Sequence, residues 1–323
     1  MSPRHNRPAP ARREERGGRS HARARRRLAA AVLVALACAG VAQADAPSAD
    51  NAAGAAVAAS VKPDPALAGL VPAEIRGRRA LLVGAQMQQQ PEDFYAADGR
   101  TPIGFEVDLM RAIAARLDLA VEYRVMAFDA LIPSLRSRRT DVVMSAMSDT
   151  KTRQKTIDFV DYFNAGITML AQKGNPEHIT GPDSLCGKGV SVQSGTTQQS
   201  FAEEQSAKCQ AQGKPAVSVV VSSSTGAQEQ ALRTGRFAVV LDDTPTAVYT
   251  AQVAGGGRLF EAIDYPPING APYGIGVGKD DAKLTAAIQK ALQSLIDDGT
   301  YGKILGAWNM GVGAVSKATV NGG

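Results

Sequence analysis

The sequence predicts an α/β protein with two lobes. Short apolar segments typical of buried strands alternate with amphipathic helices, and this cycle occurs twice before a last strand and two helices end the chain. Such alternation implies parallel sheets with right-handed crossovers. The chain has 323 residues, 44% of them hydrophobic, which is enough for two lobes of ordinary domain size.

Residues 1–44 have the pattern of an export signal. Ten arginines and two glutamates give this stretch a net charge of +8, so removing it from the total of +5 leaves −3. The basic balance therefore belongs to the leader, and we expect no nucleic-acid partner. An apolar run over residues 28–38 precedes Ala42-Gln43-Ala44, which fits a cleavage site. The apolar run is too short for a comfortable membrane span.

Two features of the leader leave alternatives open. Arg25-Arg26-Arg27-Leu28 is weakly similar to a twin-arginine signal, and an ordinary arginine-rich start is the alternative. Cys38 raises the question of lipid attachment, but the preceding Ala35-Leu36-Ala37 lacks the leucine expected three residues before such a cysteine. We therefore expect cleavage after residue 44 and a protein located outside the cytoplasm, in the periplasm.

Removing the leader leaves two cysteines, Cys186 and Cys209. An even pair in an exported chain favours a disulfide over a reactive thiol or a metal site. Residues 45–70 follow the leader. They are rich in Ala, Ser and Asp without a periodic pattern, which predicts a flexible linker.

The first cycle begins near residue 71. Residues 80–84 form its first predicted strand, and residues 105–117 form a helix whose apolar side chains recur with a 3.6-residue period: Leu109, Met110, Ile113, Ala114 and Leu117. Val121, Tyr123 and Val125 alternate as in a half-buried strand. A helix over residues 128–135 tolerates Pro133 only if it lies in the first turn.

A buried strand over residues 142–144 then ends in a hydroxyl-rich corner followed by Arg153. Ligands of α/β proteins bind where such strands end. Ser148 and Thr150 supply hydroxyl groups, and the guanidinium of Arg153 can grip a carboxylate through two parallel hydrogen bonds. The alternative is a solvated turn, with Thr150 capping a helix and Arg153 on the surface.

The second cycle comprises predicted strands over residues 190–193, 217–221 and 238–241, with helices over 198–209, 225–234 and 244–253. Gly195-Thr196-Thr197 forms a tight turn before the first of these helices. The chain closes with a strand over residues 273–277 and helices over 284–296 and 301–308.

Several blocks in this order resemble the bacterial extracellular solute-binding proteins of family 3, the periplasmic receptors for polar amino acids. The resemblance covers residues 70–311 and is carried by residues 104–114, 128–135, 145–153, 159–161, 193–198 and 298–301. It implies a type II periplasmic-binding-protein fold with two chain crossings between the lobes. The first lobe would comprise residues 71–168 and 266–311, the second residues 169–265, and residues 312–323 a C-terminal tail.

The resemblance also implies ligand contacts. Arg153 would hold the ligand carboxylate, with a backbone N–H of Thr197 at a helix N-terminus. Asp243 would take the ammonium, helped by Ser148 and the carbonyl of Ala146. The implied set also includes Ser145, Met147, Thr196 and Phe128. Capping is the alternative role for Asp243 and Thr197, and the core is the alternative place for Phe128.

The segment from Gln86 to Glu92 departs from the family pattern. Gln86 stands where many members have an acid, and Gln89 where an aromatic usually closes the pocket. An acid there pairs with a basic ligand, so two amides favour glutamine-, asparagine- or glutamate-like ligands over basic ones. Glu92 or Asp93 would overturn this expectation if the alignment slips and places an acid in the pocket.

The resemblance predicts a monomeric receptor that delivers an amino acid to the membrane subunits of an ABC-type permease, without a cofactor or metal. Closure of two lobes around a hinge would be its mechanism. Two alternatives come from other classes. Cyclohexadienyl dehydratases resemble this fold, but no nucleophile–base pair or metal cluster is evident in the sequence. A ligand-sensing module would have to act through a partner.

Overall fold

The structure, a computed structural model, describes residues 52–323. The predicted export signal, with its cleavage site and Cys38, lies outside the described residues. One continuous sheet runs through the described part of the chain in the order β4-β1-β5-β11-β6-β9-β7-β8, and β10 and β12 also pair with β6. The bounds of these strands are β1 (Ala80–Ala85), β4 (Ala120–Val125), β5 (Val142–Val143), β6 (Ile157–Gln172), β7 (Gly189–Gln193), β8 (Ser218–Ser222), β9 (Val239–Asp243), β10 (Phe260–Ala262), β11 (Ile268–Gly278) and β12 (Ala314–Val320).

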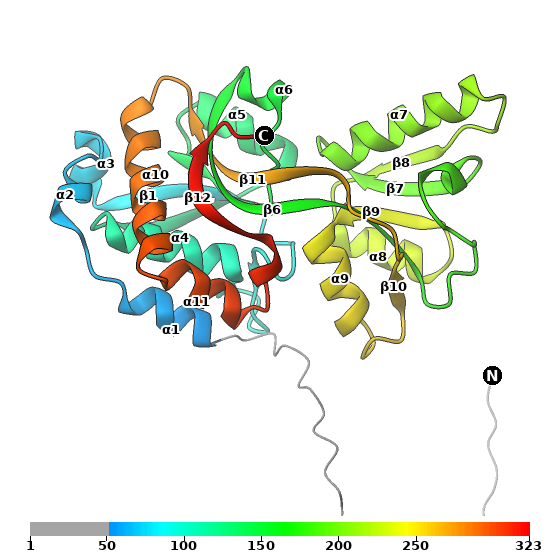
Figure 1. Cartoon of the computed structure of the whole chain (residues 1–323), viewed down its shortest axis with the longest axis horizontal. Helices are drawn as coiled ribbons and strands as arrows, with labels where there is room; N and C mark the ends of the chain where they lie inside the picture. The colour runs from blue at the N-terminus through cyan, green and yellow to red at the C-terminus, as the bar shows by residue number, and fades with distance from the viewer. Residues whose placement is uncertain (1–51) are drawn as a thin grey trace, which may run out of the picture. The chain divides into compact units, whose positions relative to one another are not determined.

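Two sets of parallel strands make up this sheet. In the first lobe β1 pairs in parallel with β4 and β5, and in the second β7 pairs in parallel with β8 and β9. The long strands β6 and β11 pair antiparallel and run side by side between the lobes (Figure 1). The predicted α/β fold with two crossings is therefore confirmed.

Helices cover the sheet in both lobes. The first lobe holds α3 (Ala73–Arg78), α4 (Phe105–Arg116), α5 (Leu131–Arg136), α6 (Lys151–Gln154), α10 (Ala282–Asp297) and α11 (Thr300–Ala307), with the short strands β2 (Phe94–Tyr95) and β3 (Pro102–Ile103). The second holds α7 (Thr197–Ala211), α8 (Thr225–Arg233) and α9 (Thr244–Val253). Single 3₁₀ turns occur at η1 (Phe128–Ala130), η2 (Pro182–Leu185) and η3 (Gly311–Gly313).

The predicted apolar face of α4 is the centre of the first core. Leu109, Met110, Ile113, Ala114 and Leu117 are all buried there. This core continues through α10 and α11 to Trp308, whose Nε1 donates to Asp108 Oδ2 at 2.9 Å. A separate core lies under β7 and β9 in the second lobe. Each lobe therefore has its own interior, and the strands that join them are shared.

The predicted flexible linker over residues 45–70 is wrong for the part that the structure describes. Residues Ala52–Ser60 form α1 and residues Pro65–Ala68 form α2. Helix α1 packs against α4 and α11, with Ala58 buried (Figure 1). Alanine has the highest helix propensity, and its small side chain permits close helix contact, so this segment needs no strong apolar period to fold.

The predicted C-terminal tail, residues 312–323, also has structure. Its strand β12 pairs antiparallel with β6, and the N–H of Gly322 donates to Asp161 Oδ2 at 2.9 Å. The N–H of Gly323 donates to Asp149 Oδ2 at 3.0 Å. The end of the chain is thus attached to the crossover strand and to the loop that precedes α6.

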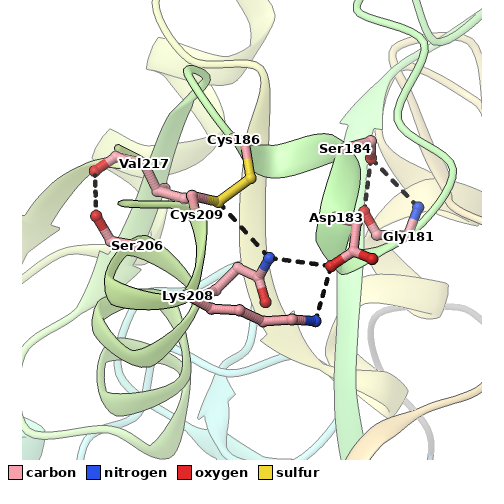
Figure 2. Close-up of a disulfide and its surroundings, with 9 residues drawn as sticks. Gly181, Asp183, Ser184, Cys186, Ser206, Lys208, Cys209 and Val217 are labelled. Atoms are coloured by element: carbon pink, nitrogen blue, oxygen red, sulfur yellow. Dashed lines mark hydrogen bonds and ion pairs between the residues drawn. A yellow bond between two sulfur atoms is a disulfide. The ribbon is translucent and has the colours of Figure 1, made fainter. Parts of the chain in front are cut away.

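A disulfide joins Cys186 and Cys209, as predicted, with Cα atoms 5.6 Å apart. It ties the loop before β7 to the last turn of α7 (Figure 2). Lys208 Nζ donates to Asp183 Oδ1 at 2.8 Å beside it. Within residues 52–323, no helix is long and apolar enough to cross a membrane.

Candidate functional site

A small, polar cavity lies between the two lobes. Both lobes contribute to its walls. Eight of the predicted ligand-binding residues and six others line it: Gln89, Phe128, Ala146, Ser148, Arg153, Gln193, Thr196, Thr197, Gln198, Thr225, Gln228, Leu241, Asp242 and Asp243.

Arg153 extends from α6 into this cavity. The side chain of Thr150 caps α6 by accepting the Arg153 N–H at 3.3 Å, so the capping alternative for Thr150 is correct. The guanidinium donates through Nη1 to the Ser148 carbonyl at 2.8 Å and through Nη2 to the Gly195 carbonyl at 3.1 Å. These bonds use two of its five N–H groups, and the others remain for a ligand. Burial lowers the pKa of Arg153 to about 10, and Asp243 opposes that shift.

Phe128 and Ala146 form the wall on the same side. The guanidinium carbon of Arg153 lies 5.3 Å from the centre of the Phe128 ring, close enough for a cation–π contact. Phe128 also belongs to the core cluster with Leu131 and Phe159, so it lies both in the core and on the cavity wall. Ala146 has φ of +47°, in the left-handed region that non-glycine residues seldom adopt.

The N-terminus of α7 faces Arg153 from the second lobe. Strand β7 ends at Gln193, and Gly195 turns the chain with φ of +75°. A Cβ at Gly195 would lie 3.1 Å from that of Asp129 in the first lobe, so the close approach favours glycine. Thr196 is the N-cap, and its Oγ1 accepts the Gln199 N–H at 3.2 Å. Thr197 is the first helical residue, where backbone N–H groups and the helix dipole favour an anion.

Asp243 ends β9 at the N-cap position of α9, but its side chain makes no capping hydrogen bond. The carboxyl group is buried and lines the cavity instead. Burial and then the neighbouring Asp242 raise its pKa to about 8, and Tyr273, Arg153 and Gln198 oppose the shift. Asp243 forms no ion pair within the described residues. It is thus a buried acid of the cavity wall without a cationic partner among these residues.

Gln89 spans the cavity between the lobes. Its Oε1 accepts from Thr225 Oγ1 at 3.1 Å, and its Nε2 donates to Asp242 Oδ1 at 3.4 Å. Asp242 is buried like its neighbour, and burial raises its pKa to about 7. Gln89, Thr225 and Asp242 thus form one hydrogen-bonded set in the cavity wall.

Gln86, Ser145 and Met147 do not line the cavity. The Ser145 hydroxyl donates to Asp93 Oδ2 at 2.7 Å and accepts the Gln86 N–H at 3.0 Å, beneath the corner. Both amide atoms of the Gln86 side chain are buried without a hydrogen-bond partner. Met147 packs into the cluster around Phe128.

Six lining residues were not predicted: Gln193, Gln198, Thr225, Gln228, Leu241 and Asp242. Several follow a common rule. Gln193, Leu241 and Asp242 lie at the carboxyl ends of β7 and β9, and Thr225 begins the helix after β8. Because the carboxyl ends of parallel strands meet at one edge of the sheet, the residues at these strand ends could have been predicted from the sequence as cavity residues.

The match to a family model decides the identity of the fold and site. Residues 81–311 match the model of the bacterial extracellular solute-binding proteins, family 3. The chain belongs to this family. It is therefore an extracellular solute-binding protein, and the two lobes with a polar cavity between them are the structural basis of that role.

Similar proteins include amino-acid receptors. The lysine/arginine/ornithine-binding periplasmic protein of Escherichia coli (strain K12) is 36% identical over 207 residues, which are 62% of this solute-binding protein and 77% of the relative. Among solved structures, an ancestral arginine-binding protein bound to arginine is 34% identical with a TM-score of 0.65, covering 72% of this chain and 98% of that one. A structure of an ancestral arginine-binding protein bound to glutamine is similar as well, with a TM-score of 0.64.

A third neighbour connects the fold with enzymes. The ancestral amino acid-binding protein AncCDT-1, a precursor of cyclohexadienyl dehydratase, is 30% identical with a TM-score of 0.65, covering 73% of this chain and 97% of that one.

Proposed function

We propose that this solute-binding protein captures an amino acid between its lobes and delivers it to an ABC-type permease. The observation that carries the proposal is the pairing, in one cavity, of a guanidinium and a helix N-terminus with an unpaired buried carboxyl group. An amino acid has both charges on neighbouring atoms, so it complements this arrangement.

The carboxylate of the ligand would bind to groups from both lobes at once. Arg153 offers its free N–H groups, and Thr197 offers a backbone N–H at the start of α7. The Ser148 and Gly195 carbonyls and the Phe128 ring fix the guanidinium in place. A carboxylate held by both lobes stabilises the closed state relative to the open one.

The cationic end would bind Asp243, the Ser148 hydroxyl and the Ala146 carbonyl. Asp243 does not cap α9, so its carboxyl group is available to an ammonium. An ammonium offers three donors, one for each of these acceptors.

For the ligand side chain we propose a long polar chain whose tip donates hydrogen bonds to Asp242. This departs from the expectation drawn from Gln86, because Gln86 does not line the cavity and Asp242 does. The cationic side chains of arginine and lysine complement Asp242 best. Glutamine ranks after them, because its side-chain amide can also donate a hydrogen bond to Asp242. A glutamate side chain would face the like charges of Asp242 and Asp243 and is disfavoured.

We propose lobe boundaries at residues 168/169 and 265/266, with a hinge in β6 and β11. Direct contacts that would then cross between the lobes include Gln89 with Thr225 at 3.1 Å, Glu92 with Thr246 at 3.0 Å, Arg153 with Gly195 at 3.1 Å and Asp129 with Ser194 at 3.1 Å. Opening would break these contacts.

A thermal-shift panel of the common amino acids, followed by calorimetry, tests the function. We expect arginine or lysine to raise the melting temperature most. Asp242→Asn should weaken the binding of arginine more than the binding of glutamine. Asp264→Asn, outside the cavity lining, is the matched control and should change neither affinity. No response to any amino acid would contradict the proposed function, whereas the strongest response to glutamate would contradict only the role of Asp242.

Catalysis is the second candidate, because burial holds the pKa of Glu92, Asp242 and Asp243 above the usual range, as a general acid requires. We propose binding instead. His178, the one histidine in the described residues, does not line the cavity. The residues that line the cavity include no nucleophile–base pair. Incubation with prephenate or arogenate tests this, and formation of product would favour the enzyme.

A further inference from the structure

Of the two corner residues after β5 that line the cavity, Ala146 and Ser148, only Ala146 has a free carbonyl. Three successive carbonyls face different partners: that of Met147 accepts the Gly274 N–H at 2.9 Å, and that of Ser148 accepts Arg153 Nη1 at 2.8 Å. The carbonyl of Ala146 accepts no hydrogen bond within the described residues. Ala146 also lines the cavity, so its carbonyl is the acceptor left for a ligand.

One side chain from outside the cavity holds this backbone in its unusual conformation. Both carboxyl oxygens of Glu106 accept the Ala146 N–H, at 2.9 Å and 3.2 Å. The hydroxyl of Tyr162 donates to Glu106 Oε1 and fixes the carboxyl group in turn. Glu106 lies in the first turn of α4, is 1% exposed and does not line the cavity.

The peptide groups before and after the 146–147 peptide are therefore both held by hydrogen bonds. Glu106 holds the N–H before it, and Gly274 holds the carbonyl after it. Between these two bonds, Ala146 keeps a φ of +47°, which a non-glycine residue retains only when its surroundings enforce it. Without Glu106 the residue can relax to a negative φ, and the direction of its carbonyl changes.

We propose that Glu106 is a positioning residue that aims the Ala146 carbonyl at the ligand ammonium. The inference rests on the proposed function, because it assigns a role within the same site. The acid acts through the backbone of Ala146 and does not touch the ligand itself.

A purely structural role for Glu106 is the alternative, since acids in the first turn of a helix are favoured by its dipole. Asp108 on the same helix provides a comparison. It is equally buried, and it bonds to Trp308 Nε1 at 2.9 Å, away from the cavity. A structural role predicts loss of stability with equal weakening of every ligand, whereas a positioning role predicts loss confined to ligands that carry the ammonium.

The test compares L-arginine with its des-amino analogue, 5-guanidinopentanoate, by calorimetry at one pH. The measured quantity is the ratio of the two affinities. We expect Glu106→Ala to lower that ratio by about tenfold, the factor that one ordinary hydrogen bond sustains, and to leave the affinity for the analogue nearly unchanged. Glu106→Gln should retain most of the ratio, because its amide oxygen can accept the Ala146 N–H.

Asp108→Asn is the matched control and should leave the ratio unchanged. If Glu106→Ala does not fold, Glu106→Asp withdraws the carboxyl group by one methylene and should lower the ratio in the same direction. An unchanged ratio in whichever of the two variants folds would overturn the inference. If the wild-type protein binds no common amino acid, the proposed function fails instead, so the two failures are distinguishable.

Discussion

Ligand binding should release protons, and its affinity should rise with pH up to about 8. Asp243 must be ionised to pair with an ammonium, but burial and Asp242 raise its pKa to about 8. The apparent dissociation constant equals the intrinsic one divided by the fraction of competent protein. At pH 6 that fraction is about one in a hundred, so binding should be about 100-fold weaker than its limit above pH 8.

Calorimetry between pH 5.5 and 8.5, in buffers with different ionisation enthalpies, measures both the slope and the protons released. We expect about a tenfold change in affinity per pH unit below pH 7, and a steeper change if Asp242, with a pKa of about 7, must also ionise. Asp243→Asn should remove the Asp243 contribution along with much of the affinity. A flat profile in the wild-type protein would show that Asp243 is ionised before the ligand arrives, and would refute the reasoning.

Four further outcomes are expected. Arg153→Ala should weaken binding by two or more orders of magnitude with the fold intact, because truncating one partner of a buried charged pair costs about 2–5 kcal/mol; near-normal affinity by calorimetry would show that the carboxylate binds elsewhere. Replacing Cys186 and Cys209 together by Ser should lower the free energy of unfolding by roughly 3 kcal/mol in denaturant titrations, and an unchanged midpoint would argue against that contribution. The folded pKa values of Asp242 and Asp243 exceed the ordinary 3.8, so the native state binds more protons than the unfolded state between pH 3.8 and about pH 8. The free energy of unfolding of the protein without ligand should therefore fall as pH rises through this window, and a rise would contradict these pKa shifts. Intact mass of exported protein should correspond to 279 residues (323 − 44) less two hydrogens, whereas an acyl chain on Cys38 would contradict cleavage after residue 44.

Periodicity predicted most of the strands and helices, because both lobes bury apolar faces of ordinary spacing. It failed where folding does not depend on such a face. Helix α1 is nearly all small residues, so its burial comes from close contact with α4 and α11 rather than from a stripe of large side chains. Strand β12 pairs along the crossover strand β6, a long-range contact that local sequence does not specify.

The site was predictable where chemistry and position agreed. Arg153 lies beyond the corner after β5 and Asp243 is the last residue of β9, and both carry charges that few structural roles need. The direction of a side chain was not predictable in the same way. Gln86 directly follows β1, but its buried side-chain amide does not line the cavity. Asp242 and Asp243, in contrast, both line it, although successive strand residues point to opposite faces. The chain turns into α9 at Thr244, which frees the last strand residue from that alternation.

The charges around the cavity explain why an empty site should favour the open form. Closing the lobes without a ligand buries Asp242 and Asp243 on one side and Glu92 on the other, with Arg153 as the single cation in the cavity lining. Burial raises the pKa of all three acids, which means that it disfavours their charged forms. In the proposed binding mode, a ligand with one carboxylate and two cationic groups would satisfy Arg153 and leave a positive charge for each aspartate. Such a ligand would therefore stabilise the closed state more than the open one, and this difference would let a permease distinguish a loaded receptor from an empty one.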